Sequence, residues 1–541
     1  MCTANDVVGD TGIQRTAPPN SPPLVRPEPT NRIAWLAALL LTVAYVAVFA
    51  HFSSTLPLQD YPNHLARAVV MADLLFHHGA NFGGVFEYHF LAVPYVLGDL
   101  ALAAAIGLLG ITGAAALWNA VMVLSFPAAL LFYLRTLDLS AAARALAAIL
   151  SLYLTTDWFL AKGFIAFRLA VAMTLVGLAL ARRLRQRQSA AVYGAYACVI
   201  ALGYLVHLTV TVFEAVAVGV TGLLGLAMRK TSLGREIAIL LPIAAALAWQ
   251  LGIAGHYQRA TDVPSDYYFW GTLATKLRDF DVQFMRYSPR IDLLMLAILG
   301  ACVLWPAARN CRAARLKQPV VLETLTLSAT FVALYFVLPV GYADAWYVDA
   351  RAAEFAILFL IVACLALPGE DAASGTVGRL VAVPLAILLA AANLAYLTKH
   401  FAADSAWLGL YRQIVAAVPS RASVLPIYTR APEGSVRPLL HAAAHAVIDR
   451  EADIPYLFSG NGGYPMKYFR YVRTPYAPDE MWYNTRGPVD WRAVGCDYDY
   501  LLVMKPFEPR RIALPTATVA ENTAAALLAI GKAPCQAAPY P

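Results

Sequence analysis

The chain has 541 residues, of which 60% are hydrophobic and only 14% are charged, and its mean hydropathy is +0.59. These values exclude a water-soluble protein of this length. The apolar residues recur in runs of about 20, the length a helix needs to cross a bilayer, which predicts a polytopic membrane protein. The net charge of +7 is modest, and Lys and Arg concentrate in short loops at residues 182–188, 229–235 and 309–317. That pattern is typical of cytoplasmic loops, so we expect no nucleic-acid partner.

Residues 1–31 are rich in Pro, Thr and Asn and lack an apolar run, which predicts a disordered leader. A transmembrane domain is predicted over residues 32–398. Its candidate spans are residues 33–52, 90–110, 114–134, 142–156, 159–181, 190–206, 209–228, 237–253, 291–308, 320–340, 352–367 and 380–398.

The basic loops also predict the orientation of the chain. If they face the cytoplasm, residues 399–541 lie outside it, and Arg26 and Arg32 place the first loop, residues 53–89, in the periplasm. The two placements differ by one crossing of the membrane, so the predicted number of crossings between residues 90 and 181 is wrong by one. We therefore expect a bundle of about 11–13 helices with an odd number of crossings.

The last part of the chain, residues 399–541, has frequent Pro, Gly, Tyr and charge and no spanning run. It is predicted to be an extracytoplasmic α/β domain, with helices at residues 406–418 and 523–530 and buried strands at residues 423–428 and 498–504. The expected fold class is an all-α polytopic transmembrane bundle with a C-terminal α/β domain. Cys496 and Cys535 of this domain either pair or stay reduced, since spacing alone does not establish geometry.

The segment LPLQDYPNHLAR, residues 56–67, places Asp60, His64 and Arg67 just outside the first span. Pro62 disfavours a helix immediately before it, so Asp60 is expected on a loop at the membrane rim, where a carboxylate can act as a general base. Residues 64–77 are expected to form a short interfacial helix that frames a groove open to lipid. The alternative is an ordinary solvated loop with a helix cap.

A second set of polar residues lies within an apolar run. His207, Thr211 and Glu214 share one face of a hydrophobic helix. A carboxyl group in lipid is costly unless it faces the bundle interior or a partner. The pattern indicates either a functional site or a helix–helix hydrogen bond from Glu214 to His207 or Thr211.

Charged and aromatic residues also gather at the ends of two spans. Arg351 and Glu354 lie one turn apart at the outer start of a span, where a guanidinium suits a lipid phosphate. Alternatively, Arg351 extends to the interface and pairs with Glu354 or Asp349. Asp157 and Lys162 belong to another mixed patch, which either meets the carrier phosphate or sugar or forms a plain interfacial belt.

The order of these features resembles the GT-C superfamily of membrane glycosyltransferases over the whole chain: an initial span, a first loop with an Asp and a following helix, many spans and a soluble C-terminal domain. The LQDYPNH string is similar to the first-loop segment of uncharacterised bacterial members. The resemblance implies that a sugar is taken from a polyprenyl-phosphate carrier, with inversion expected and Asp60 as base or site organiser. Tyr61 follows Asp60 where the protein mannosyltransferase branch has Glu, which argues against protein O-mannosylation.

We therefore predict a bacterial inner-membrane glycosyltransferase that transfers a polyprenyl-phosphate-linked sugar to a glycan or lipid acceptor on the periplasmic side. Asp60 is the expected catalytic residue, and the expected substrate-binding residues are His64, Arg67, Asp157, Lys162, His207, Arg351 and Glu354. No metal motif is present, but a divalent cation between Asp60 and Asp157 stays open, so the cofactor is unknown. The alternatives are a multi-pass transporter or flippase, and a non-enzymatic envelope assembly protein.

Overall fold

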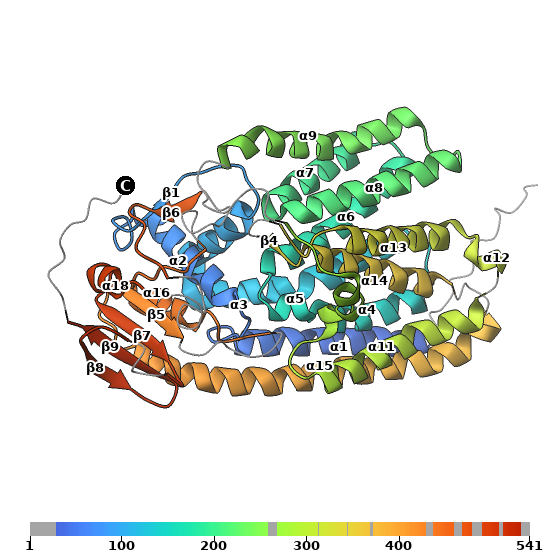
Figure 1. Cartoon of the computed structure of the whole chain (residues 1–541). Helices are drawn as coiled ribbons and strands as arrows, with labels where there is room; N and C mark the ends of the chain where they lie inside the picture. Colours follow the sequence, from blue (N-terminus) through green and yellow to red (C-terminus); the bar gives the residue numbers. More distant parts are fainter. Residues whose placement is uncertain are drawn as a thin grey trace, which may run out of the picture.

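The computed structural model describes residues 29–257, 268–311, 313–342, 345–367, 372–428, 436–458, 468–478, 489–507 and 512–531. Long helices run side by side, and a small sheet of the C-terminal region lies at one end of them (Figure 1). This arrangement confirms the predicted fold class, a helical bundle with a C-terminal α/β region. The predicted leader, residues 1–31, lies outside the described part of the chain except for the start of the first helix.

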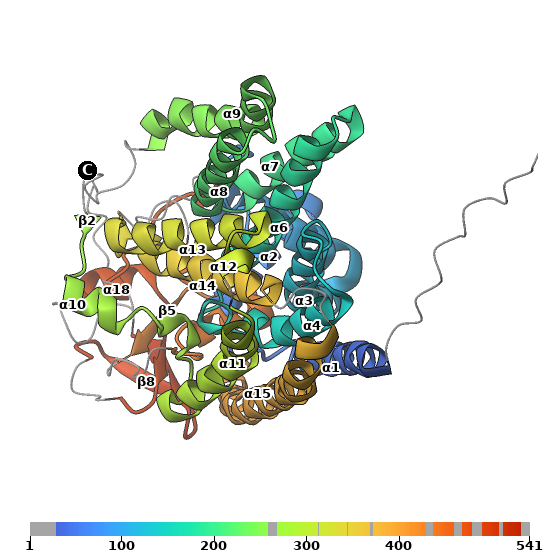
Figure 2. The same ribbon diagram turned by 90° about the vertical axis from the view of Figure 1, so that its right-hand side faces the viewer.

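Eleven helices of the described chain form the bundle. They are α1 (Pro29–His51), α3 (Val96–Leu134), α4 (Ala141–Thr155), α6 (Ile165–Gln186), α7 (Ala190–Val206), α8 (Leu208–Ala227), α9 (Leu233–Tyr257), α11 (Pro289–Asn310), α13 (Pro319–Val337), α14 (Val348–Ala366) and α15 (Ala372–Val415). Eight of them are long and apolar enough to cross a membrane, by length and composition. Of the other three, α4 and α7 are shorter and α14 begins with several charged residues. Viewed along the bundle, α13 and α14 lie between α9 and α15 (Figure 2).

The three basic loops gather at the end of the bundle that is remote from the C-terminal sheet. Arg182 at the end of α6 pairs with Glu323 at the start of α13 (Nη1 to Oε2, 2.6 Å). Arg185 pairs with Glu236 at the start of α9 (Nη2 to Oε2, 2.8 Å). We call this end the basic end, and we call the end with the C-terminal sheet the site end.

The chain between the first loop and α4 crosses once, where the sequence predicted two crossings. Gly110 within α3 has a φ of +70°, which interrupts the helix. The first half of α3 packs along α2, and its Asp99 pairs with Arg67 of that helix at the site end. Only the second half reaches the basic end, where Thr136 just beyond it accepts a hydrogen bond from α6. The separate span predicted at residues 90–110 is therefore wrong, and this removes the disagreement of one crossing.

Short elements complete the loops. The helices are α2 (Tyr61–Phe76), α5 (Trp158–Ala161), α10 (Leu273–Arg278) and α12 (Ala313–Leu316), and η1 (Val282–Phe284) is a 3-10 turn. The strands β2 (Tyr268–Phe269), β3 (Gly341–Tyr342) and β4 (Ala345–Trp346) form an antiparallel sheet in that order.

The C-terminal region contains a sheet with the strand order β5-β7-β9-β8. The strands β5 (Val424–Tyr428) and β7 (Tyr500–Met504) are parallel, and β9 (Ala525–Ile530) runs antiparallel to both β7 and β8 (Thr516–Glu521). Its described helices are η2 (Ala442–Ala444), α16 (His445–Arg450) and α18 (Trp491–Asp497). The strands predicted at residues 423–428 and 498–504 are confirmed. The helix predicted at residues 406–418 is the end of α15, which passes residues 398 and 399 without a break.

The helix predicted at residues 523–530 is wrong, because this segment is strand β9. Its run AALLAI has no polar side, and five of its six residues are buried between β7 and β8. Periodicity cannot assign a short apolar run, and a central strand that is covered on both faces has this composition.

The two C-terminal cysteines were predicted either to pair or to stay reduced. Cys496, in α18, is disulfide-bonded. Cys535 lies outside the described residues. A disulfide is typical of an oxidising compartment.

Helix α2 is enclosed, where the sequence predicted a short interfacial helix that frames a groove open to lipid. It begins at Tyr61, with Pro62 in its first turn, where a missing amide hydrogen costs nothing. Twelve of its sixteen residues are buried. The bundle covers one side and the C-terminal region covers the other, where Asn63 Nδ2 donates to the backbone oxygen of Tyr456 (2.7 Å). The strand β1 (Phe86–Tyr88) of the first loop also pairs with β6 (Phe469–Tyr471), so the first loop and the C-terminal region form one packed layer.

A buried ion pair anchors α2 in that layer. Arg67 Nε and Nη2 donate to the two carboxylate oxygens of Asp99 at 2.6 and 2.8 Å. Tyr468 of the C-terminal region donates to the same carboxylate, and His64 Nδ1 accepts from Arg67 Nη2 (3.0 Å). The Arg67 side chain is fully buried, so the loss of either charge leaves the other without water or a counter-ion.

We predict that Arg67→Gln lowers the free energy of unfolding by about 3–5 kcal/mol, because Asp99 is left buried without its cation. Thermal unfolding of the purified protein in detergent measures the effect. Arg278→Gln, which removes an exposed pair with Asp279, is the control and should leave the melting temperature unchanged. A variant Arg67→Gln as stable as the wild type would show that the pair is not structural.

Candidate functional site

The Asp60 carboxylate lies where the first loop, the bundle and the C-terminal region meet. The backbone of the first loop is held by the turn between α5 and α6: Asp60 N donates to the oxygen of Lys162 (3.0 Å), and Gln59 N donates to the oxygen of Ala161 (3.1 Å). Gly163 in that turn has a φ of +78°, and a Cβ there would lie only 2.6 Å from Asp60 N. Glycine is thus required for this close approach, which fixes Asp60 against the bundle.

The side chain of Asp60 is 14% exposed and faces polar groups from three parts of the chain. His441 Nε2 of the C-terminal region lies 3.3 Å from Asp60 Oδ1, and Gln59 Nε2 donates to the same oxygen (3.4 Å). Lys162 is a further neighbour, because Asp60 is the principal charge that stabilises its ammonium. A carboxylate that is partly exposed can take a proton from a hydroxyl that comes within hydrogen-bond distance.

Lys162 is buried beside Asp60 and contacts two aromatic rings. Its Nζ donates to Gln59 Oε1 (3.2 Å) and lies 5.1 Å from the ring centroid of Trp158 and 5.6 Å from that of Tyr347. Burial lowers the pKa of Lys162 from 10.5 to about 8, although Asp60 favours the charged form. The ammonium is therefore easily neutralised when the surroundings change.

Arg351 is a buried guanidinium whose predicted partners are occupied elsewhere. Asp349 pairs with Lys276 (Oδ2 to Nζ, 3.2 Å), and Glu354 pairs with Arg168. Within the described chain, the Arg351 side chain has no carboxylate at ion-pair distance, and its one hydrogen bond there is a long one from Nη1 to Thr209 Oγ1 (3.4 Å).

Aromatic rings hold the Arg351 guanidinium in place. It lies 5.6 and 5.5 Å from the ring centroids of Phe164 and Phe167. His207 contacts the ring of Phe167 and lies 3.4 Å from the hydroxyl of Tyr95 through Nε2. Arg351 and His207, both predicted as site residues, therefore lie around one phenylalanine. We call this group the Arg351 site.

One aromatic cluster is shared by the Asp60 site, which comprises Asp60, Gln59, Lys162 and His441, and the Arg351 site. Trp158 and Tyr347 meet edge to face at 4.8 Å, and Phe164 lies 6.3 Å from Trp158 and 6.2 Å from Tyr347. Lys162 lies over two of these rings, and Arg351 lies over the third. The two sites are thus neighbours that contact the same three rings, which we call the aromatic wall.

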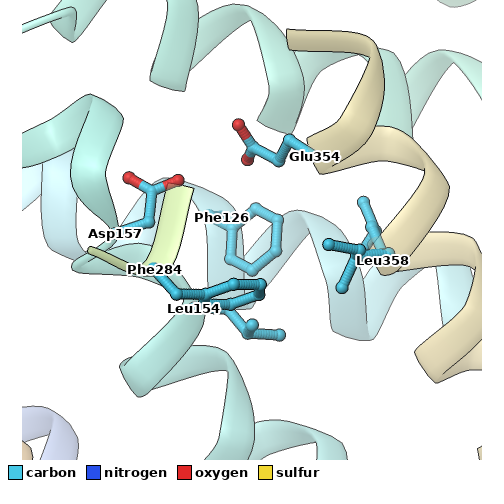
Figure 3. Close-up of a pocket in the computed structure, with 7 residues that line it drawn as sticks. Phe126, Leu154, Asp157, Phe284, Glu354 and Leu358 are labelled. Atoms are coloured by element: carbon cyan, nitrogen blue, oxygen red, sulfur yellow. The ribbon is translucent and has the colours of Figure 1, made fainter. Parts of the chain in front are cut away.

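Asp157 and Glu354 lie in a third place, inside the bundle. Arg168 pairs with both carboxylates, at 2.8 Å from Asp157 Oδ2. Figure 3 shows the two acidic side chains on either side of the Phe126 ring, in a small cavity with mostly apolar walls. Asp157 Oδ1 also accepts from Leu160 N (2.9 Å), so both of its oxygens have partners.

The positions of these carboxylates also decide whether Asp60 and Asp157 could share a metal ion. In the described part of the chain, no group of three or more His, Cys, Asp or Glu side chains could hold an ion. Asp157 faces Arg168 and not Asp60, so the residues present do not fit a cation shared by the two carboxylates. We derive no step through a metal.

The remaining predicted residues, His64 and Arg67, lie in the anchor of α2 on the side of Asp99. Burial lowers the pKa of His64, although Asp99 favours its charged form. The structure therefore places the predicted residues in four settings, of which the Asp60 and Arg351 sites share the aromatic wall.

Sequence reasoning missed the contributions of the C-terminal region. His441 faces Asp60, and the backbone amide of Arg437 donates to Gln59 Oε1 (3.0 Å). The only local signal is the pair His441 and His445 in an alanine-rich segment, and nothing in it indicates a contact with residues almost 400 positions earlier.

No protein-family model matches the chain. No curated protein matches it either. Among solved structures, that of ArnT from Cupriavidus metallidurans bound to undecaprenyl phosphate is similar: the alignment covers 91% of this chain and 97% of that chain, at 12% sequence identity and a TM-score of 0.36. At this level we carry no residue role and no ligand from one chain to the other.

We predict that the pKa of Lys162 makes the stability depend on pH. Between pH 8 and pH 10.5 the unfolded chain keeps a proton that the folded chain has lost, so the free energy of unfolding rises with pH across this window. The Lys162→Met variant has no titrating group at this position, so its free energy of unfolding lacks this rise with pH. Melting temperatures should show the variant more stable than the wild type below pH 8, by a margin that shrinks towards pH 10.5.

Lys230→Met, which removes an exposed lysine at the basic end, is the matched control and should show no such trend. A constant difference between Lys162→Met and the wild type at every pH would mean that Lys162 titrates normally in the folded protein.

Proposed function

We propose that the chain is a membrane glycosyltransferase of GT-C type, which transfers a sugar from a polyprenyl-phosphate carrier to an acceptor hydroxyl. The observation that carries the proposal is the juxtaposition of Asp60 and Arg351. A carboxylate suited to proton abstraction and a buried guanidinium without a carboxylate partner in the described chain lie on neighbouring sides of one aromatic wall. A lipid-linked sugar phosphate needs these two groups and an apolar or aromatic surface between them.

In this proposal Asp60 is the base. Its carboxylate takes the proton of the acceptor hydroxyl while the hydroxyl oxygen forms a bond to the anomeric carbon. The bond from that carbon to the phosphate oxygen breaks with its electron pair, so polyprenyl phosphate leaves, and the configuration inverts. The proton then passes from Asp60 to water. The base and the carrier phosphate are held in fixed positions, which replaces a chance encounter by an oriented one.

Arg351 is the proposed ligand of the carrier phosphate. A buried guanidinium without a counter-ion is costly, and an anionic ligand removes that cost when it binds. The planar fork of an arginine also suits two phosphate oxygens. His207 and Thr209 lie beside Arg351 and belong to the same proposed phosphate site. Lys162, next to Asp60, offers a second positive charge towards the leaving phosphate.

The proposal leaves four predicted ligands out of the reaction: His64, Arg67, Asp157 and Glu354. Arg67 and His64 are engaged with Asp99, and the Asp157–Arg168–Glu354 group is closed on itself inside the bundle. We assign these residues to the scaffold that fixes α2 and the start of α6.

Two features support an orientation with the site end in the periplasm of a bacterial inner membrane. The basic loops lie together at the opposite end, as cytoplasmic loops do. Cys496, at the site end, is disulfide-bonded, which suits an oxidising compartment. The sugar acceptor would then be an envelope glycan or lipid, and the donor would be loaded with its sugar before it reaches the site.

One observation favours the alternative of a transporter. Glu214 is buried in α8, lies against Gly177 of α6, and its Oε1 has no partner in the described chain. The hydrogen bonds from Glu214 to His207 or Thr211 that the sequence left open are not formed. Unpaired carboxyl groups inside membrane bundles are common in ion-coupled carriers.

We predict that Asp60→Asn abolishes transfer. The donor is the polyprenyl-phosphate sugar that accumulates in a deletion strain, identified by mass spectrometry and used as extracted. Membranes with wild-type protein should consume it, and membranes with Asp60→Asn should be slower by at least about 10²-fold, because the variant cannot accept a proton. Asp138→Asn, an exposed position at the basic end, is the control for expression and charge.

Full activity of Asp60→Asn would remove Asp60 from the reaction. If the deletion changes no lipid-linked sugar at all, the enzyme proposal fails, and a loss of function on Glu214→Gln would then support a transporter.

We predict that Arg351→Gln weakens the binding of undecaprenyl phosphate by about 10–100-fold, since a hydrogen bond to a charged group contributes about 1.5–3 kcal/mol. Thermal stabilisation of the protein by this lipid in nanodiscs measures the affinity. The control is Arg183→Gln, which removes a guanidinium held over the ring of Phe132 at the basic end. Equal binding by Arg351→Gln and the wild type would place the phosphate elsewhere.

A further inference from the structure

We propose that His441, from the C-terminal region, is the positioning residue that holds Asp60 in its reactive orientation, and that Asn63 sets the tautomer of His441 for this task. The inference rests on the proposed function of Asp60 and adds to it. It makes the catalytic centre a composite of the first loop and the C-terminal region.

The hydrogen-bond pattern assigns the two ring nitrogens of His441. Asn63 Nδ2 donates to the backbone oxygen of Tyr456 (2.7 Å), so this amide corner must be the NH2 group, since the oxygen of the side chain could not face a carbonyl. The same Nδ2 lies 3.0 Å from His441 Nδ1, which must therefore accept. The ring proton is then on Nε2, and Nε2 lies 3.3 Å from Asp60 Oδ1, so the ring presents its N–H side to the carboxylate.

The contacts of Asp60 then divide its two oxygens. Both described side-chain donors, His441 Nε2 and Gln59 Nε2, lie at Oδ1. Oδ2 accepts no hydrogen bond from the described residues. A carboxylate fixed through one oxygen presents the other to the acceptor hydroxyl at a defined angle, which is the requirement for an efficient base.

His441 is itself rigidly held, as a positioning residue must be. Its side chain is 5% exposed, its ring meets that of Phe458 edge to face at 5.2 Å, and its backbone oxygen accepts from Ala444 N (3.0 Å). Asp60 is the N-cap of α2 and Asn63 lies in the first turn of that helix, so the base and the residue that orients its partner are held by the same helix end.

Three substitutions separate positioning from mere structure. Asn63→Asp changes an NH2 group to an acceptor of the same size, which moves the ring proton to Nδ1 and turns an electron pair of Nε2 towards Asp60. His441→Gln retains an N–H donor close to the position of Nε2, and His441→Phe retains bulk without a donor. His445→Gln is the matched control: a buried histidine four residues later that faces Asp449 and not Asp60.

The experiment measures consumption of the donor extracted from the deletion strain by full-length protein in nanodiscs, together with the ¹⁵N shifts of the His441 ring. We expect Nε2–H in the wild type and Nδ1–H in Asn63→Asp. We expect rates about 10²-fold lower for Asn63→Asp and His441→Phe, and rates within about fivefold of the wild type for His441→Gln and His445→Gln.

The inference is overturned if Asn63→Asp or His441→Phe keeps the wild-type rate, if His441→Gln falls as far as His441→Phe, or if the wild-type ring is protonated on Nδ1. A failure of the proposed function looks different, because the wild type itself then consumes no donor while the ¹⁵N shifts still report the tautomer.

Discussion

The burial of α2 between the bundle and the C-terminal region determines the geometry of the whole site end. The Arg67–Asp99 pair, joined by Tyr468, ties three distant parts of the chain together without access to water. A buried ion pair is costly to form because both charges lose their water, and the loss of one partner costs more because the other charge then stays buried alone. The pair therefore favours the packing of α2 in which both charges have their partner. Asp60 is the residue immediately before this helix, so its position follows from the anchor.

The distribution of charge at the site end separates scaffold from site. Lys276 and Arg168 each have carboxylate partners, and these pairs lie between helices that must stay in place. Arg351 has none in the described chain, and Lys162 has Asp60 only as a neighbour. A buried charge is costly without a counter-charge, and this is the reason for proposing that Arg351 binds an anion from outside the chain. A lipid phosphate is such an anion, and the aromatic wall beside it suits a sugar or an isoprenoid chain.

The role of the C-terminal region changes accordingly. A soluble domain after a membrane bundle is easily taken for an appendage, yet here it covers α2, pairs a strand with the first loop and sends His441 to Asp60. In the proposed composite centre, the first loop supplies the carboxylate and the C-terminal region supplies the histidine beside it.

The sequence by itself determined the properties that depend on neighbouring residues. The length and apolarity of each run identified a membrane bundle, the basic loops identified one of its ends, and the polar segment around Asp60 indicated the place where we propose the site, because these features are local. Only the tertiary structure decided that residues 525–530 form a central strand, that Gly110 divides a helix of which one half crosses, and that Asp349 and Glu354 turn away from Arg351. It also brought His441 to Asp60. Such outcomes depend on which groups, hundreds of residues apart in the sequence, pair with one another in the folded chain. A local sequence pattern does not contain that information.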